Sequence, residues 1–124
     1  MASVQDRIVS LKPILTKNLE ENILKFWISK TIDRENGGFY GNIDHENNPV
    51  KKANKGVILN TRILWTFSAA EHLMCTGRYK EFADRAYNYI IENFIDKKYG
   101  GVYWELDFKG KFLNPHLRHC MGEP

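Results

Sequence analysis

The 124-residue chain has little cysteine, no long apolar run and no clustered charge. Its two cysteines are too few for a disulfide framework. No apolar run approaches the roughly 18 residues of a membrane span, and residues 1–12 lack the apolar segment of a signal peptide. The 18 Lys and Arg residues are scattered among 15 Asp and Glu residues, whereas nucleic-acid binding usually needs a clustered basic face. These absences predict a cytoplasmic protein without a membrane or nucleic-acid partner.

What the chain does contain is enough apolar material for a packed core. Apolar residues make up 43% of the sequence and aromatic residues 13%, which argues against intrinsic disorder. The length corresponds to one domain or part of one.

The most informative stretch is residues 55–75, KGVILNTRILWTFSAAEHLMC. It is apolar nearly all the way round, which predicts a helix buried on all faces, ending near Gly77 as a capping residue. A charged group inside such a helix must be paired, hydrated or placed for a ligand. Arg62 is therefore the leading candidate site residue. Asn60 and Thr66 could share its inner face, but a structural role is favoured for both, as hydrogen-bond partners of helix ends or of neighbouring polar groups. The structural alternative is an ion pair between Arg62 and a carboxylate such as Glu71, or a pair with a residue of the barrel outside this chain.

Two amphipathic helices flank this stretch. The first has apolar residues every three or four positions, which predicts one buried stripe: Val4, Ile8, Leu11, Leu15, Leu19, Ile23 and Trp27. Pro13 predicts that this helix either starts nearby, with Ser10 as its cap, or is kinked. The other helix is expected over residues 79–94.

A twelve-residue segment occurs twice, at 33–44 and 96–107, at an offset of 63 residues. Both copies contain Gly-Gly turn chemistry and a short strand-like run, which predicts a small β-hairpin in each. Five identities in register link the copies: Asp33, Gly37, Gly38, Tyr40 and Asp44 match Asp96, Gly100, Gly101, Tyr103 and Asp107. The repeating unit is an amphipathic helix, a Gly-Gly hairpin, a loop and an apolar helix, and such units stack to share a core.

The alternation of one-sided and all-apolar helices indicates an outer and an inner helix layer. The predicted fold is all-α: an (α/α)6 barrel, of which this chain holds the first one and a half to two helical hairpins. An open solenoid remains the alternative. Six units of this size would need about three times the present length.

Three motifs resemble the N-acylglucosamine 2-epimerase superfamily, most closely its cellobiose 2-epimerase branch. They are NGGFYG at 36–41, KKANKGVILNTRILWTFSAA at 51–70 and DKKYGGVYWELDFKGK at 96–111. The resemblance runs from about residue 22 to residue 111, and it too implies an (α/α)6 barrel.

The resemblance also implies a reaction. Such enzymes invert C2 of the reducing-end glucose of β-1,4-linked disaccharides such as cellobiose or lactose, by proton abstraction and return through an enediolate. Arg62 corresponds to the family's arginine, which implies sugar binding and enediolate stabilisation. The acid–base histidines are expected from later helices outside this chain, and no metal or organic cofactor is implied. Aldose–ketose isomerisation, N-acylglucosamine epimerisation, and an inactive fragment or binding module remain open.

The resemblance ends after Lys111. Residues 1–111 are therefore predicted to be the N-terminal part of the barrel domain, and residues 112–124, FLNPHLRHCMGEP, a truncated or frame-shifted tail. Cys120 stands where the family has a tyrosine. Because such a fragment lacks most of its inner helices, we expect exposed apolar surface and self-association.

Several other residues have both a functional and a structural interpretation. Trp27 and Trp65 are expected in the core, and His72 packed or capping near the end of its helix. Tyr103 and Trp104 could stack on a sugar, although packing of the second hairpin is favoured.

The remaining candidates are polar. The repeated aspartates could form a glycosidase pair, but their positions beside turns favour hairpin hydrogen bonds: Asp33, Asp44, Asp96 and Asp107. A metal site of His116, His119 and Cys120 is disfavoured because no second ligand cluster completes it. His45 is expected in a turn.

Overall fold

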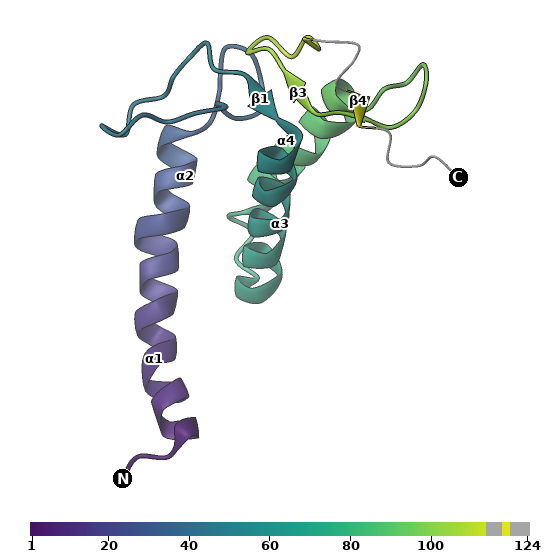
Figure 1. Ribbon diagram of the computed structural model, residues 1–124. Coiled ribbons are helices and arrows are strands. Elements are labelled where there is room, and N and C mark those ends of the chain that lie inside the picture. Colours follow the sequence, from purple (N-terminus) through teal and green to yellow (C-terminus); the bar gives the residue numbers. More distant parts are fainter. Residues whose placement is uncertain (114–117, 120–124) are drawn as a thin grey trace. The chain divides into compact units, whose positions relative to one another are not determined.

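The computed structural model describes residues 1–113, 118 and 119 (Figure 1). The chain divides into two compact units, Met1–Thr31 and Ile32–Pro124. No helix in the described part of the chain is long and apolar enough to cross a membrane.

The first unit is one helical run. It consists of α1 (Val4–Asn18), a π-helical segment η1 (Leu19–Leu24) and α2 (Lys25–Lys30). Ser3 is the N-cap: its Oγ accepts a hydrogen bond from the Asp6 N–H at 3.1 Å, and the Asp6 carboxylate accepts the Ser3 N–H at 3.0 Å. This reciprocal capping box satisfies donors that a helix start otherwise leaves unpaired. The predicted start near Pro13 is therefore wrong, because Pro13 lies inside α1 and Ser10 is not the cap.

The apolar stripe of this run is not buried. No residue of α1 is buried, and five members of the predicted stripe have exposed fractions between 42% and 75%: Val4, Ile8, Leu11, Leu15 and Ile23. The periodicity correctly predicts the helix, but the expected burial of the stripe is wrong for this chain.

The core of the second unit is formed mainly by two helices that pack against each other. Helix α3 (Val57–Met74) packs against α4 (Lys80–Tyr89), which continues as the π-helical segment η2 (Ile90–Phe94). One buried cluster joins the start of α3 to the end of α4, to η2 and to a short strand further along the chain: Val57, Tyr89, Ile90, Phe94 and Leu106. An aromatic cluster lies further along the same pair of helices, with the Phe67 ring 5.3 Å from Phe82, 6.3 Å from Phe39 and 6.4 Å from Tyr79.

The sequence repeat is also a structural repeat. Ile32 pairs with Phe39 and Ile95 with Val102 in isolated antiparallel bridges, at the same offset of 63 residues. Both Gly-Gly pairs adopt positive φ: 82° and 64° at Gly37 and Gly38, and 79° and 80° at Gly100 and Gly101. These angles are readily adopted only by glycine, so the two predicted hairpin turns are confirmed.

Short strands connect the loops of the second unit. Strand β1 (Lys55–Gly56) pairs antiparallel with β3 (Glu105–Leu106), and β2 (Val102–Tyr103) pairs antiparallel with β4 (Arg118–His119). The Val57 N–H also donates to the Trp104 carbonyl at 3.0 Å. The first turn of α3 is thereby fixed to the second hairpin.

Helix α3 ends differently from the prediction. Its C-cap is Cys75, whose φ of 51° and ψ of 39° place it in the left-handed region. Gly77 also has positive φ, but it lies two residues beyond the cap. The predicted cap at Gly77 is therefore wrong, because the helix has already closed at a non-glycine residue.

Candidate functional site

Helix α3 has a buried face and an exposed face, so the expected burial on all sides is wrong. Its buried residues recur at helical spacing: Val57, Asn60, Ile63, Phe67 and Ala70. The other face carries Ile58, Arg62, Trp65 and Leu73, and the exposed fractions of its three large apolar side chains are 44%, 73% and 77%. In this chain the apolar composition of α3 reflects two different apolar faces, only one of which is covered.

Arg62 lies on the exposed face, in the second turn of α3. The prediction of a buried guanidinium is therefore wrong for this chain. Among the described residues, no hydrogen bond or ion pair to its side chain is present. The pair with Glu71 is also wrong, because the Glu71 carboxylate accepts the backbone N–H groups of Gly77 at 2.6 Å and Tyr79 at 2.9 Å. These two hydrogen bonds lower the pKa of Glu71.

Asn60 does not share a face with Arg62. Two residues along an α-helix correspond to a rotation of about 200°, and Asn60 is buried with an exposed fraction of 1%. Its side-chain amide donates to the Gly56 carbonyl at 2.8 Å. This bond serves the start of the helix, which confirms the structural interpretation of Asn60.

The two tryptophans assigned to the core differ from that expectation. Trp27 is half-buried, and Trp65 is exposed. The exposed side of α3 therefore presents a guanidinium and an indole one turn apart. His72 is exposed as well, in the last turn of the same helix.

Of the two aromatic residues in the second hairpin, Tyr103 packs against another ring and Trp104 is partly exposed. The Tyr103 ring stacks on Phe112 with centroids 5.0 Å apart and an interplanar angle of 7°. Trp104 is 46% exposed. Packing of the second hairpin is thus confirmed for Tyr103.

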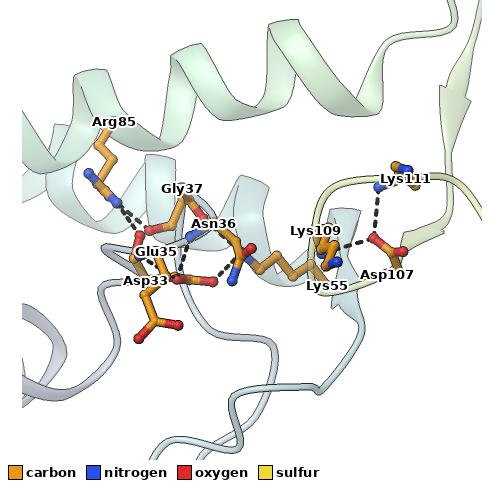
Figure 2. A network of polar contacts seen from close by, with 10 residues as sticks. Asp33, Glu35, Asn36, Gly37, Lys55, Arg85, Asp107, Lys109 and Lys111 are labelled. Atoms are coloured by element: carbon orange, nitrogen blue, oxygen red, sulfur yellow. Dashed lines mark hydrogen bonds and ion pairs between the residues drawn. The ribbon is translucent and has the colours of Figure 1, made fainter.

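A buried ion pair is the main feature that the sequence did not reveal (Figure 2). Lys55 is fully buried, and its Nζ donates to Asp33 Oδ2 at 2.7 Å and to the Gly37 carbonyl at 2.7 Å. The same Nζ lies 5.0 Å from the centroid of the Tyr89 ring. Burial tends to raise the pKa of Asp33, but the hydrogen bonds from Lys55 and the Asn36 and Glu35 N–H groups outweigh it, so the pKa lies below its usual value.

Arg85 and Tyr89 of α4 complete this network. The Arg85 guanidinium donates to the Gly38 carbonyl at 2.8 Å and to the Asp33 carbonyl (Figure 2). A Cβ added at Gly38 would lie 2.7 Å from Tyr89 Cγ, so only glycine fits against the ring. Burial, together with the charges of Asp33 and Asp107, raises the pKa of Tyr89 to about 12. The charged groups of this network are engaged with one another, which identifies it as structural, whereas the buried Tyr89 hydroxyl has no hydrogen-bond partner among the described residues.

The repeated aspartates stabilise turns. Oδ1 of Asp44 accepts the N–H groups of Glu46 and Asn48, and Oδ1 of Asp107 accepts those of Lys109 and Lys111. Asp33 and Asp96 each accept two N–H groups of their own hairpins: Glu35 and Asn36, and Lys98 and Tyr99. The hydrogen-bonding interpretation is confirmed for all four. His45 lies in the first of these turns, as expected.

In the described part of the chain, no group of three or more His, Cys, Asp or Glu side chains could hold a metal ion. Two members of the disfavoured metal trio, His116 and Cys120, lie outside the described residues, and only the backbone of His119 is described.

Comparison with known families settles the relationship. Residues 38–119 match the family model of N-acylglucosamine 2-epimerase (GlcNAc 2-epimerase). The chain belongs to this family. The match includes Arg62 and the helices α3 and α4, and it extends past Lys111. The boundary expected at residue 111, and the truncated or frame-shifted tail, stay predictions.

Cellobiose 2-epimerases are among the similar proteins. The cellobiose 2-epimerase of Bacteroides fragilis is 47% identical over 104 residues, which cover 84% of this chain and 26% of the relative. The structure of cellobiose 2-epimerase from Bacillus thermoamylovorans B4167 matches with a TM-score of 0.80 at 38% identity, covering 84% of this chain and 26% of its own. That of Spirochaeta thermophila matches with a TM-score of 0.81 at 30% identity, covering 92% and 28%.

These solved structures are (α/α)6 barrels, and the match falls on their N-terminal part. The predicted fold class is therefore confirmed. The chain spans about a quarter of the length of these relatives.

Proposed function

We propose that this chain supplies the first part of the active site of a carbohydrate epimerase that inverts C2 of a reducing-end glucose. The observation that carries the proposal is the position of Arg62 within the family match, exposed on the second turn of α3 and with no hydrogen bond or ion pair to its side chain among the described residues. A guanidinium in this position is free to donate hydrogen bonds to the oxygen atoms of a ligand.

The chemistry requires such a group. Removal of the C2 proton from the open-chain aldose places negative charge on the C1 oxygen of an enediolate. A guanidinium stays protonated at any physiological pH and offers several N–H donors in a fixed plane. Arg62 would therefore bind the C1 and C2 oxygens and stabilise the enediolate more strongly than the neutral sugar.

We expect the proton-transfer groups to come from outside this chain, as the family resemblance implies. Abstraction and return of a proton on opposite faces of C2 require two groups that titrate near neutral pH, a role suited to histidine. The described histidines are unsuited to it: His45 lies in a surface turn of the first hairpin, and His72 is two to three turns beyond Arg62. The complete site thus needs the remaining repeats of the barrel.

The similarity to cellobiose 2-epimerases favours a β-1,4-linked disaccharide with a reducing-end glucose as the substrate.

The test is an isotope-exchange assay. The chain is combined with the complementary barrel segment of the Bacteroides fragilis relative and incubated with cellobiose in heavy water. We expect deuterium at C2 and the glucosyl-mannose product, and roughly a 100- to 1,000-fold lower exchange rate for Arg62→Gln, as for the loss of an oxyanion-stabilising donor. Arg34→Gln, which changes an exposed arginine in the first hairpin, is the matched control. Equal rates for Arg62→Gln and Arg34→Gln would contradict the proposal.

A further inference from the structure

We propose that Asn36 is a site of spontaneous deamidation, at which the backbone nitrogen of Gly37 displaces the side-chain amide as ammonia. The inference concerns the first Gly-Gly turn and is independent of the proposed function. It matters to the fold because the carbonyls of this turn bind Lys55 and Arg85 (Figure 2).

The first argument is the dipeptide itself. Asn36 is the only asparagine in the sequence that is followed by glycine, and asparagine is among the thermolabile residues. In the reaction, the nitrogen of the next residue must reach the carbonyl carbon of the asparagine side chain. Glycine has no Cβ to obstruct that approach. Both residues are half-buried, so water also has access to the reacting atoms.

The second argument is that the surrounding network leaves the reacting atoms unbound. Lys55 Nζ binds the Gly37 carbonyl at 2.7 Å, and Arg85 binds the Gly38 carbonyl at 2.8 Å. The backbone N–H of Asn36 donates to a carboxylate oxygen of the turn at 2.9 Å. Among the described residues, however, neither the side-chain amide of Asn36 nor the N–H of Gly37 makes a hydrogen bond. The nucleophile and the carbon that it attacks are therefore both available.

The second Gly-Gly turn supplies an internal contrast. Its first glycine, Gly100, donates its N–H to the Asp96 carbonyl at 2.9 Å. The residue before that glycine is Tyr99, which has no amide to lose. The modification is therefore confined to the first of the two turns.

The reaction needs no reagent other than water. The Gly37 nitrogen loses its proton to hydroxide and forms a bond to Cγ of Asn36. The Cγ–Nδ2 bond breaks, and ammonia leaves with a proton taken from water. Water then adds across either of the two C–N bonds of the cyclic imide. One product is an aspartate, and the other is an isoaspartate, in which the main chain runs through the former side chain.

Both products disturb the turn. Each places a new carboxylate on the residue whose N–H binds the Asp33 carboxylate, and neighbouring like charges repel. The isoaspartate also adds one carbon to the backbone before Gly37. The Tyr89 ring leaves little room for adjustment, since a Cβ added at Gly38 would lie 2.7 Å from its Cγ. The lengthened turn therefore loses hydrogen bonds between its glycine carbonyls and their cationic partners.

The experiment is incubation of the folded 124-residue chain at mildly alkaline pH, followed by peptide mapping. Mass spectrometry detects the replacement of NH2 by OH, and an isoaspartyl methyltransferase labels the isoaspartate. We expect Asn36 to convert several-fold faster than Asn42, which is exposed in the same twelve-residue segment but is followed by the β-branched Ile43. Asn36→Gln should keep its amide, because its longer side chain must close a larger ring.

Urea denaturation of the aged chain measures the structural consequence. We expect its midpoint to be lower than that of the Asn36→Asp variant, which carries the new charge without the extra backbone carbon. Equal midpoints would contradict the loss of hydrogen bonds in the lengthened turn.

Two outcomes would overturn the site itself. One is an intact amide at Asn36 in the folded chain when a urea-unfolded sample of the same chain deamidates there, since the fold would then protect the dipeptide. The other is an equal rate of conversion at Asn36 and Asn42, since neither the glycine nor the unbound nitrogen would then determine the site of reaction.

Discussion

Lys55 shows how a charged residue can be fully buried for structural reasons in this chain. Its Nζ has a carboxylate, a carbonyl and an aromatic ring as partners. Lys55 directly precedes Gly56, the N-cap of α3, and its bonds to Asp33 and Gly37 therefore tie the start of this helix to the first hairpin. The charge is thus compensated locally, unlike that of Arg62.

We expect Lys55→Met to lower the free energy of unfolding by about 3 to 5 kcal/mol, because it leaves the Asp33 carboxylate buried without its cation. Lys51→Met is the matched control: Lys51 pairs with Glu35 at 3.2 Å, and both side chains are about two-thirds exposed. Such an exposed pair contributes less than about 1 kcal/mol. Urea denaturation measures both variants, and similar losses for the two would contradict the assignment.

At the residue scale, hydrogen bonds between near neighbours in the sequence could be predicted, whereas contacts between distant residues could not. The turn aspartates were predicted because each bonds to N–H groups within four residues of itself. The Lys55–Asp33 pair spans 22 residues, and nothing in a run such as KKANKG distinguishes a buried lysine from its exposed neighbours. Trp65 was misplaced because helical periodicity identifies apolar faces without showing which of them a neighbour covers.

At the scale of elements, the helices and hairpins follow their local sequence signals, and the deviations occur at helix ends. The Ser3 capping box set the start of α1 in preference to Pro13. The C-terminal end of α3 lies at Cys75, where a left-handed backbone conformation crowds the side chain against its own backbone.

We expect Cys75→Gly to raise the free energy of unfolding by about 1 kcal/mol, because glycine adopts positive φ without this steric cost. Cys75→Ala is the control, since it removes the thiol but retains a Cβ at the same φ. Shifts in the urea midpoint provide the measurement. If Cys75→Ala were as stabilising as Cys75→Gly, the gain would come from the thiol and not from backbone strain.

At the scale of the whole molecule, each unit retains an uncovered apolar face. These faces are the α1 stripe and the side of α3 that carries Ile58, Trp65 and Leu73. The exposure of α3 confirms the expectation of exposed apolar surface, which followed from counting repeats against the length of a barrel.

Self-association remains a prediction. We expect the chain to sediment as a mixture of species at micromolar concentration and to bind hydrophobic dyes, since exposed apolar patches favour association. Leu73→Lys should shift the distribution toward monomer, because Leu73 is 77% exposed. Val50→Lys, at an apolar loop residue that is 37% exposed, should not. A homogeneous wild-type monomer with a sharp cooperative melt would contradict this expectation.

The hydrogen bonds from Arg85 to the Asp33 and Gly38 carbonyls link residues 52 and 47 positions apart. During translation the amino-terminal residues leave the ribosome first. The first Gly-Gly turn therefore leaves the ribosome before Arg85 does, and its Asp33 and Gly38 carbonyls bind water until Arg85 has been synthesised. Completion of the first turn therefore depends on the synthesis of the helix that carries Arg85.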